Sequence, residues 1–242
     1  MVNSRKNSVI KEIIFSADEF RLKGYLHLPP LEYPSFVIGC HGLFSDKNSP
    51  KQIELAQHCN QLDIAYFRFD HRGCGESKAP FDALTSLDAR CRDLKCAVNT
   101  LKARDDLGHQ MGLFGSSMGG CVCLAAAQDL APHAIVTWAA PIRSADLVPQ
   151  HDHSSGGSDS PFKNNPFNIS NALANLHNIL IFHSAADETV PLAHADEIYE
   201  RVSEPKKRVV FSQSNHLMSQ PADQQTFMRE ASLWFKVFLK PD

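Results

Sequence analysis

One serine stands at the centre of a short motif whose residue types suit nucleophilic chemistry. Gly115-Ser116-Ser117-Met118-Gly119 follows an apolar run and opens a run of small residues, so it is predicted to join a strand to a helix. On so sharp a turn the serine hydroxyl is lifted out of the sheet, and small residues must flank it because larger side chains would clash. The pattern predicts that Ser117 is a nucleophile. The competing interpretations are a glycine turn with a capping serine, or a nucleophilic Ser116, which lies off the motif centre.

A serine hydroxyl needs a general base that a third group orients. Asp187 follows the apolar run that ends at His183, and His216 follows the last apolar run before the C-terminal segment. Each taken alone fits a helix cap or a solvated loop residue. Together with Ser117 they stand in the order Ser, Asp, His, each just beyond a predicted strand. The sequence therefore predicts a Ser117–His216–Asp187 catalytic triad.

Acyl transfer by such a triad also needs N–H donors for the developing oxyanion. The N–H of Met118 follows the nucleophile at the start of a predicted helix, whose N-terminus carries partial positive charge. His41-Gly42-Leu43-Phe44 follows an earlier strand, and its glycine allows close backbone approach. We expect Leu43 N–H to be the second donor and His41 to hold the loop.

The elements that must position these residues alternate between strands and helices. The predicted strands are 9–15, 20–28, 35–40, 64–70, 110–114, 134–138, 178–183 and 208–211. The spacing of apolar residues predicts helices in most of the segments between the later strands, the first at 50–61. It also predicts a C-terminal helix with Phe227, Trp234 and Phe238 on one face. The pattern favours an α/β fold in which a mostly parallel sheet has helices on both faces and its site at the carboxyl ends of the strands.

Composition excludes several other classes of protein. The chain has 242 residues and a formal net charge of −3, so it lacks the excess of basic residues that is typical of nucleic-acid-binding proteins. At 43% apolar content it is not disordered throughout, and no run approaches the length of a membrane helix or a signal-peptide core. We expect a cytoplasmic protein without membrane or nucleic-acid partners.

Metal and disulfide chemistry are not favoured either. The 7 cysteines lack zinc-site spacing, and several lie in apolar segments, which favours buried free thiols. His151 and His153 lie in a Ser/Gly-rich stretch without further ligands. We predict no metal and no cofactor.

One long segment interrupts the alternation. Residues from Pro141 to about 176 separate two strands and include the Ser/Gly-rich stretch. So long a connection inside a compact domain is usually functional or disordered. We interpret the chain as a single domain, residues 1–242, with a short lid insertion at about 141–176.

These motifs resemble those of α/β-hydrolase-fold serine hydrolases over nearly the whole chain. The resemblance rests on His41-Gly42, on the run 70–77 (DHRGCGES), on residues 115–119, on Asp187 with Val190-Pro191, and on His216. The chain is similar to small carboxylesterases of the cinnamoyl/feruloyl type and to the serine aminopeptidase-like group. The resemblance implies an eight-stranded sheet, a structural role for Asp70 and Arg72, and hydrolysis through an acyl-enzyme.

The substrate is expected to be a small acyl or aryl ester. The lid region has few charges and no glutamate, which argues against capture of a free amine, although Asp146 offers one carboxylate. The predicted pocket contains these residues: His41, Gly42, Phe44, Phe162, Phe167 and Leu217. Peptidase, thioesterase and perhydrolase activities use the same triad and stay open. A ligand-binding protein without catalysis is the alternative from another class, and the oligomeric state stays open.

Overall fold

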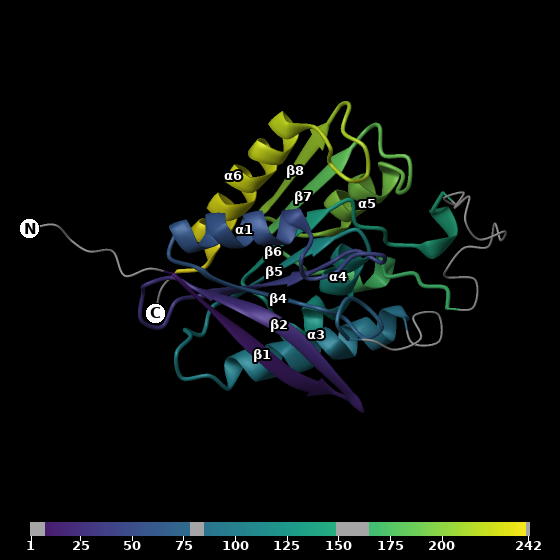
Figure 1. Cartoon of the computed structure of the whole chain (residues 1–242). Coiled ribbons are helices and arrows are strands. Elements are labelled where there is room, and N and C mark those ends of the chain that lie inside the picture. The colour runs from purple at the N-terminus through teal and green to yellow at the C-terminus, as the bar shows by residue number, and fades with distance from the viewer. Residues whose placement is uncertain (1–7, 78–84, 149–164, 241–242) are drawn as a thin grey trace, which may run out of the picture.

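The computed structural model describes residues 8–77, 85–148 and 165–240, and its centre is one eight-stranded sheet (Figure 1). Along the sheet the strand order is β1-β2-β4-β3-β5-β6-β7-β8. β1 and β2 pair with each other and with β4 in antiparallel fashion, and every other pairing is parallel. The strands are β1 (Val9–Ala17), β2 (Phe20–Leu28), β3 (Phe36–Cys40), β4 (Ala65–Phe69), β5 (Met111–Ser116), β6 (Ala134–Trp138), β7 (Ile179–Ser184) and β8 (Lys206–Phe211).

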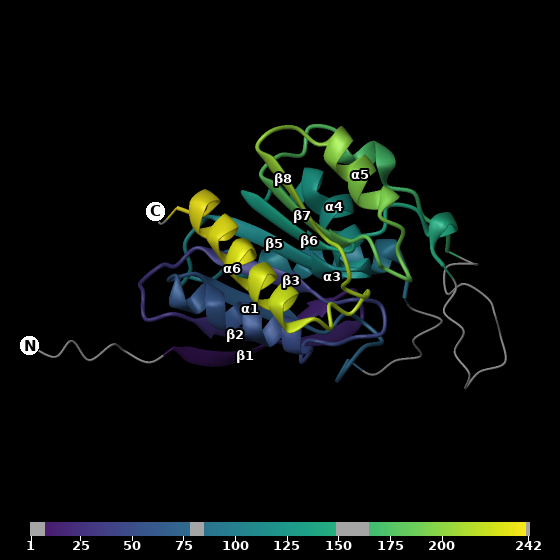
Figure 2. The same ribbon diagram turned by 90° about the horizontal axis from the view of Figure 1, so that it is seen from above.

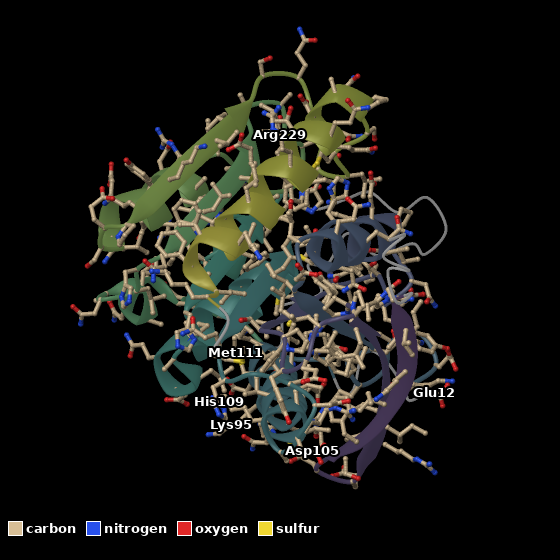
Figure 3. The ribbon with its side chains drawn as sticks, turned by 90° about the vertical axis from the view of Figure 1, so that its left-hand side faces the viewer. Glu12, Lys95, Asp105, His109, Met111 and Arg229 are labelled. Carbon is tan, nitrogen blue, oxygen red and sulfur yellow. The ribbon has the colours of Figure 1, made fainter. Side chains whose placement is uncertain are left out.

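Helices cover both faces of this sheet. α1 (Pro50–Gln61) and α6 (Pro221–Phe238) lie side by side on one face, and α3 (Leu87–Lys102) and α4 (Met118–Leu130) lie on the other (Figure 2). Figure 3 shows the molecule from the side at which Met111 begins β5, and Arg229 of α6 and Lys95 of α3 lie on opposite sides of the sheet. α5 (Ala193–Arg201) and two short 3₁₀ turns, Ser144–Asp146 and Ser170–Leu173, complete the described elements. The mostly parallel α/β sheet predicted from the sequence is confirmed.

Local signals explain where the helices begin. Ser49 caps α1 by accepting a hydrogen bond from the N–H of Gln52, and Pro50 occupies the first turn, where its missing N–H costs nothing. Ser86 caps α3 in the same way, with the N–H of Ala89 as donor at 3.1 Å. α1 begins at Pro50, ten residues after β3 ends at Cys40, directly after the loop that follows that strand.

Two apolar cores lie on the two sides of the sheet. Leu94 of α3 and Leu124 of α4 belong to one core, while Leu55 of α1 and Phe227 of α6 belong to the other. All seven cysteines are free thiols, as predicted, and five of them are buried. Among the helices of the described ranges, none combines the length and apolarity needed to cross a bilayer.

Several strand boundaries differ from prediction by one or two residues, and the pairing between strands explains two of these differences. β5 runs on through Gly115 and Ser116, because these residues pair with Thr137 and Trp138 of β6, a contact that no local pattern reveals. β8 begins at Lys206 rather than at Arg208, because Lys206 and Lys207 pair with Ile179 and Leu180 of β7.

The predicted lid is described only in part. Residues 141–148 and 165–176 contain the two 3₁₀ turns and an isolated bridge between Arg143 and Asn168, and the stretch between them lies outside the described residues. The assignment of one domain with a lid stays a prediction.

Candidate active site

Ser117 lies in a strained turn between β5 and α4. Its backbone has φ 53° and ψ −122°, a conformation that residues other than glycine rarely adopt and that is typical of functional sites. The N–H of Ser117 donates to the carbonyl of Trp138 at 2.7 Å, which fastens the turn to β6. A Cβ atom at Gly119 would lie 2.1 Å from the carbonyl oxygen of Cys40, so only glycine lets α4 approach the end of β3 this closely. Neighbouring strands thus hold the turn in place.

Asp187 lies in the turn after β7, with its carboxylate fully buried. Its Oδ1 accepts hydrogen bonds from the N–H groups of Thr189 at 2.9 Å and Val190 at 2.8 Å. Burial opposes ionisation, but the neighbouring His216 and these two N–H donors outweigh it and hold the pKa of Asp187 below its ordinary value. Asp187 is therefore a fixed, ionised acceptor.

His216 lies in the loop after β8 and contacts both other residues. Its Nδ1 is 2.8 Å from Oδ2 of Asp187, and its Nε2 is 3.0 Å from Oγ of Ser117. The loop is held by the N–H of His216, which donates to Glu188 Oε2, and by its carbonyl, which accepts from the indole of Trp138 at 2.8 Å. The structure thus brings Ser117, His216 and Asp187 into one hydrogen-bonded chain. In it Nδ1 can donate while Nε2 accepts the proton of Ser117.

The loop after β3 lies against the turn that holds Ser117. A Cβ atom at Gly42 would lie 3.7 Å from Cβ of Ser117. Within the described residues, the N–H groups of Leu43 and Met118 donate to no other group. Both donors therefore remain available beside Ser117.

A buried arginine holds this loop from behind. Arg90 of α3 is inaccessible to solvent, and its guanidinium donates to the carbonyls of His41 and Gly42, each at 3.4 Å, and of Leu43 at 3.0 Å. When successive carbonyls point toward Arg90, the intervening N–H groups face away from it. Sequence reasoning missed Arg90, because a charged residue in an amphipathic helix is indistinguishable from its solvated neighbours.

His41 and the glycine-rich loop 70–77 support the same region. His41 is buried, and its Nε2 accepts from the backbone N–H of His71 at 3.1 Å, which fits the predicted loop-holding role. Asp70 pairs with Lys47 at 2.6 Å and accepts from the N–H of Glu76. Arg72 pairs instead with Asp93 of α3. Asp70 and Arg72 both fasten the loop, each through its own partner.

The predicted pocket residues do not all gather around Ser117. Phe44 and Leu217 are 79% and 72% exposed in the loops next to the site. Phe167 instead lines a cavity of about 620 Å³ between α3, α4 and residues 165–172, which none of Ser117, Asp187 and His216 lines. Its segment pairs with residues 143–144 and contacts α4, and its place in a pocket beside Ser117 stays a prediction. Phe162 lies outside the described residues.

Two further residues near the site carried no clear sequence signal. His183 is buried at the end of β7, and its Nε2 lies 2.8 Å from the carbonyl of Val190, which fixes the turn that holds Asp187. Lys51, in the first turn of α1, places its Nζ 3.4 Å from Oγ of Ser116. An apolar strand end and a surface-like helix gave no reason to single out either residue.

No metal centre is evident in the part of the chain that the structure describes. There, no group of three or more His, Cys, Asp or Glu side chains is arranged to hold an ion. The absence of a metal stays a prediction, and His151 and His153, the histidines weighed as ligands, lie outside the described ranges.

Comparisons with known proteins agree with this architecture. The uncharacterized protein YfhR of Escherichia coli K12 is 27% identical over 187 residues, which cover 75% of this chain and 62% of YfhR, so the chain spans less than two thirds of that relative. The esterase PF2001 of Pyrococcus furiosus has a TM-score of 0.82 at 18% identity, covering 96% of this chain and 92% of the esterase. Est1E of Butyrivibrio proteoclasticus, solved with ferulic acid, has a TM-score of 0.79 at 16% identity, covering 93% and 98%. These structures share the α/β-hydrolase fold.

Residues 34–155 match the family described as serine aminopeptidase, S33. The match spans half of the chain and includes the loop after β3, the glycine-rich loop and the Ser117 turn. The chain therefore belongs to the serine aminopeptidase (S33) family of α/β hydrolases.

Proposed function

We propose that this protein is a serine hydrolase that cleaves small acyl or aryl carboxylic esters through an acyl-enzyme. The observation that carries the proposal is the hydrogen-bonded chain from Ser117 Oγ through His216 to the buried carboxylate of Asp187. The strained backbone at Ser117 supports it, since strain is expected where the hydroxyl must project from the sheet.

The first half of the reaction forms the acyl-enzyme. Ser117 Oγ attacks the ester carbonyl while its proton moves to Nε2 of His216, and Asp187 stabilises the resulting imidazolium. The carbonyl oxygen becomes an oxyanion that accepts from the N–H groups of Leu43 and Met118, each contributing about 3 kcal/mol to the barrier reduction. The bond to the leaving oxygen then breaks, and His216 returns its proton to that oxygen. The alcohol departs and the acyl group stays on Ser117.

The second half regenerates the enzyme. A water molecule gives its proton to His216 and attacks the acyl carbon, and the same two N–H groups accept the second oxyanion. Ser117 Oγ leaves and takes the proton back from His216, which releases the carboxylic acid. Every proton transfer uses groups of this chain and water, so the scheme requires no cofactor.

The surroundings of Ser117 favour an apolar or aromatic substrate. Phe44 and Leu217 present large apolar side chains from the loops after β3 and β8. Exposed apolar side chains beside a nucleophile provide contact surface for an acyl or aryl group. Within the ester class, we therefore expect better turnover of butyrate or aryl esters than of acetate.

The test is a series of p-nitrophenyl esters from acetate to palmitate, with one aryl ester of a hydroxycinnamic acid. Wild type is compared with Ser117→Ala and with Ser203→Ala, a control in which the altered serine is exposed at the end of α5. We expect Ser117→Ala to lose on the order of 10⁴-fold or more in turnover. Retention of a tenth of the wild-type rate in Ser117→Ala would overturn the assignment.

A covalent probe separates the remaining alternatives. A fluorophosphonate should label wild type and Ser116→Ala but not Ser117→Ala, and peptide mapping should locate the label at Ser117. Labelling without ester turnover would shift the substrate toward thioesters or aminoacyl amides, which are assayed next. Neither labelling nor turnover would indicate a ligand-binding protein without catalysis.

A further inference from the structure

Lys51 brings a cation to the edge of the nucleophilic turn. Its Nζ lies 3.4 Å from Oγ of Ser116, the residue before Ser117, and 5.0 Å from the ring centroid of Trp138. The Trp138 indole in turn donates to the carbonyl of His216. The ammonium thus contacts Ser116, which precedes Ser117 in the chain, and Trp138, which forms a hydrogen bond with His216.

This cation has no carboxylate partner among the described residues, where none of the ion pairs includes Lys51. Lys47, four residues earlier, differs in this respect, because its buried ammonium pairs with both Asp70 and Glu76. An ammonium has three donors, and the contact with Ser116 uses one of them. Two donors of Lys51 have no partner among the described residues.

The position of Lys51 in its helix makes the unpaired charge more costly. The first turn of α1 contains no acidic residue, and a cation there faces the positive end of the helix dipole. Burial lowers the pKa of Lys51 to about 7, although the charge of Asp187 acts in the opposite direction. An anion paired with this ammonium would offset the unpaired charge.

We propose that Lys51 binds a carboxylate on the substrate, so that the enzyme prefers esters that carry a negative charge near the scissile bond. The proposal rests on the proposed ester hydrolysis and names its substrate class. A carboxylate bound here completes an ion pair with Lys51 that the described part of the fold leaves open. Charge-assisted hydrogen bonds of this kind change affinity by about 10- to 100-fold.

The experiment compares esters that differ only in charge. p-Nitrophenyl hydrogen glutarate is paired with p-nitrophenyl valerate to probe the acyl side. p-Carboxyphenyl butyrate is paired with phenyl butyrate to probe the leaving-group side. Each pair is assayed with wild type, Lys51→Met, Lys51→Gln and Lys51→Arg, and with Lys102→Met as a control whose lysine is exposed at the end of α3.

We expect Lys51→Met and Lys51→Gln to lower kcat/KM for one of the two charged esters by about 10- to 100-fold. The neutral partner should change less than about 3-fold, and Lys51→Arg should keep most of the preference. The ester that responds tells which side of the scissile bond the carboxylate occupies. Equal losses on charged and neutral esters, or no loss on either charged ester, would overturn the proposal.

A binding measurement keeps the proposal separate from the catalytic assignment. Calorimetric titration of glutarate and of p-hydroxybenzoate into Ser117→Ala measures anion binding where no turnover occurs. Adding Lys51→Met should weaken the binding of one of them by about 10-fold or more. If Ser117→Ala binds neither anion, or if Lys51→Met leaves binding unchanged, Lys51 is not an anion site, whatever the outcome of the ester series.

Discussion

Replacing Asp187 by asparagine tests whether the Asp187 carboxylate determines which ring nitrogen of His216 holds the proton. Oδ1 of Asp187 accepts from the N–H groups of Thr189 and Val190 and lies 3.0 Å from Nδ1 of His216, while Oδ2 is the nearer oxygen, 2.8 Å from Nδ1. An asparagine must place its carbonyl oxygen where Oδ1 is, because its NH₂ group cannot accept those two bonds. Its NH₂ group then takes the place of Oδ2 and donates to Nδ1 of His216.

That donation reverses the tautomer of the imidazole. With Nδ1 as acceptor, the proton lies on Nε2, 3.0 Å from Ser117 Oγ, where a free lone pair is required. A wrong tautomer in such a triad lowers kcat by about 10⁴-fold, equivalent to about 5.5 kcal/mol of transition-state stabilisation. The geometry of the site changes little, because the asparagine keeps the two backbone hydrogen bonds.

The assay is steady-state hydrolysis of p-nitrophenyl butyrate by wild type, Asp187→Asn and Glu188→Gln. Glu188 is the next residue and also has a carboxylate, but its Oε2 accepts from the backbone N–H of His216 rather than from the ring. A glutamine can still accept that bond, so we expect less than about a 10-fold change in Glu188→Gln. A loss below about 30-fold in Asp187→Asn, or equal losses in both variants, would refute the tautomer argument.

Two further predictions concern buried charged or titratable groups. Arg90→Met should lower kcat/KM by about 10- to 100-fold, because the carbonyls of the loop around Leu43 lose their donor, whereas Arg90→Lys should keep part of the rate; a lowered melting temperature with unchanged kcat would show that Arg90 acts on stability alone. His27 is buried and accepts from Arg68, and burial followed by the Arg68 charge lowers its pKa to about 4. The unfolded chain binds this proton more readily, so the free energy of unfolding should fall by about 3 kcal/mol as the pH drops from about 6.5 to about 4. Urea unfolding of His27→Gln should lack that part of the pH dependence, whereas His177→Gln, a control at an exposed histidine, should keep it. If the free energy of unfolding changes equally with pH in both variants, His27 is not the responsible group.

The fold and the core of the site were readable in the sequence because they depend on local patterns. Strands and helices follow from apolar periodicity, and the Ser117 turn follows from glycines at fixed spacing around a serine. Asp187 and His216 could be named because strand ends in a parallel sheet share one edge. Each inference needs only neighbouring residues and one topological rule.

The tertiary structure alone decided what surrounds that core. Arg90 of α3 donates to the loop after β3, which lies some fifty residues earlier in the chain. Lys51 of α1 donates to Ser116, the residue before Ser117. Phe167 is directed toward α3 and α4 because its segment pairs with the chain that leaves β6. No sequence periodicity records which distant surfaces come into contact, since long-range packing depends on how whole helices and loops cross. The turn that projects Ser117 is therefore determined locally, whereas the charges and side chains that surround it are determined by packing.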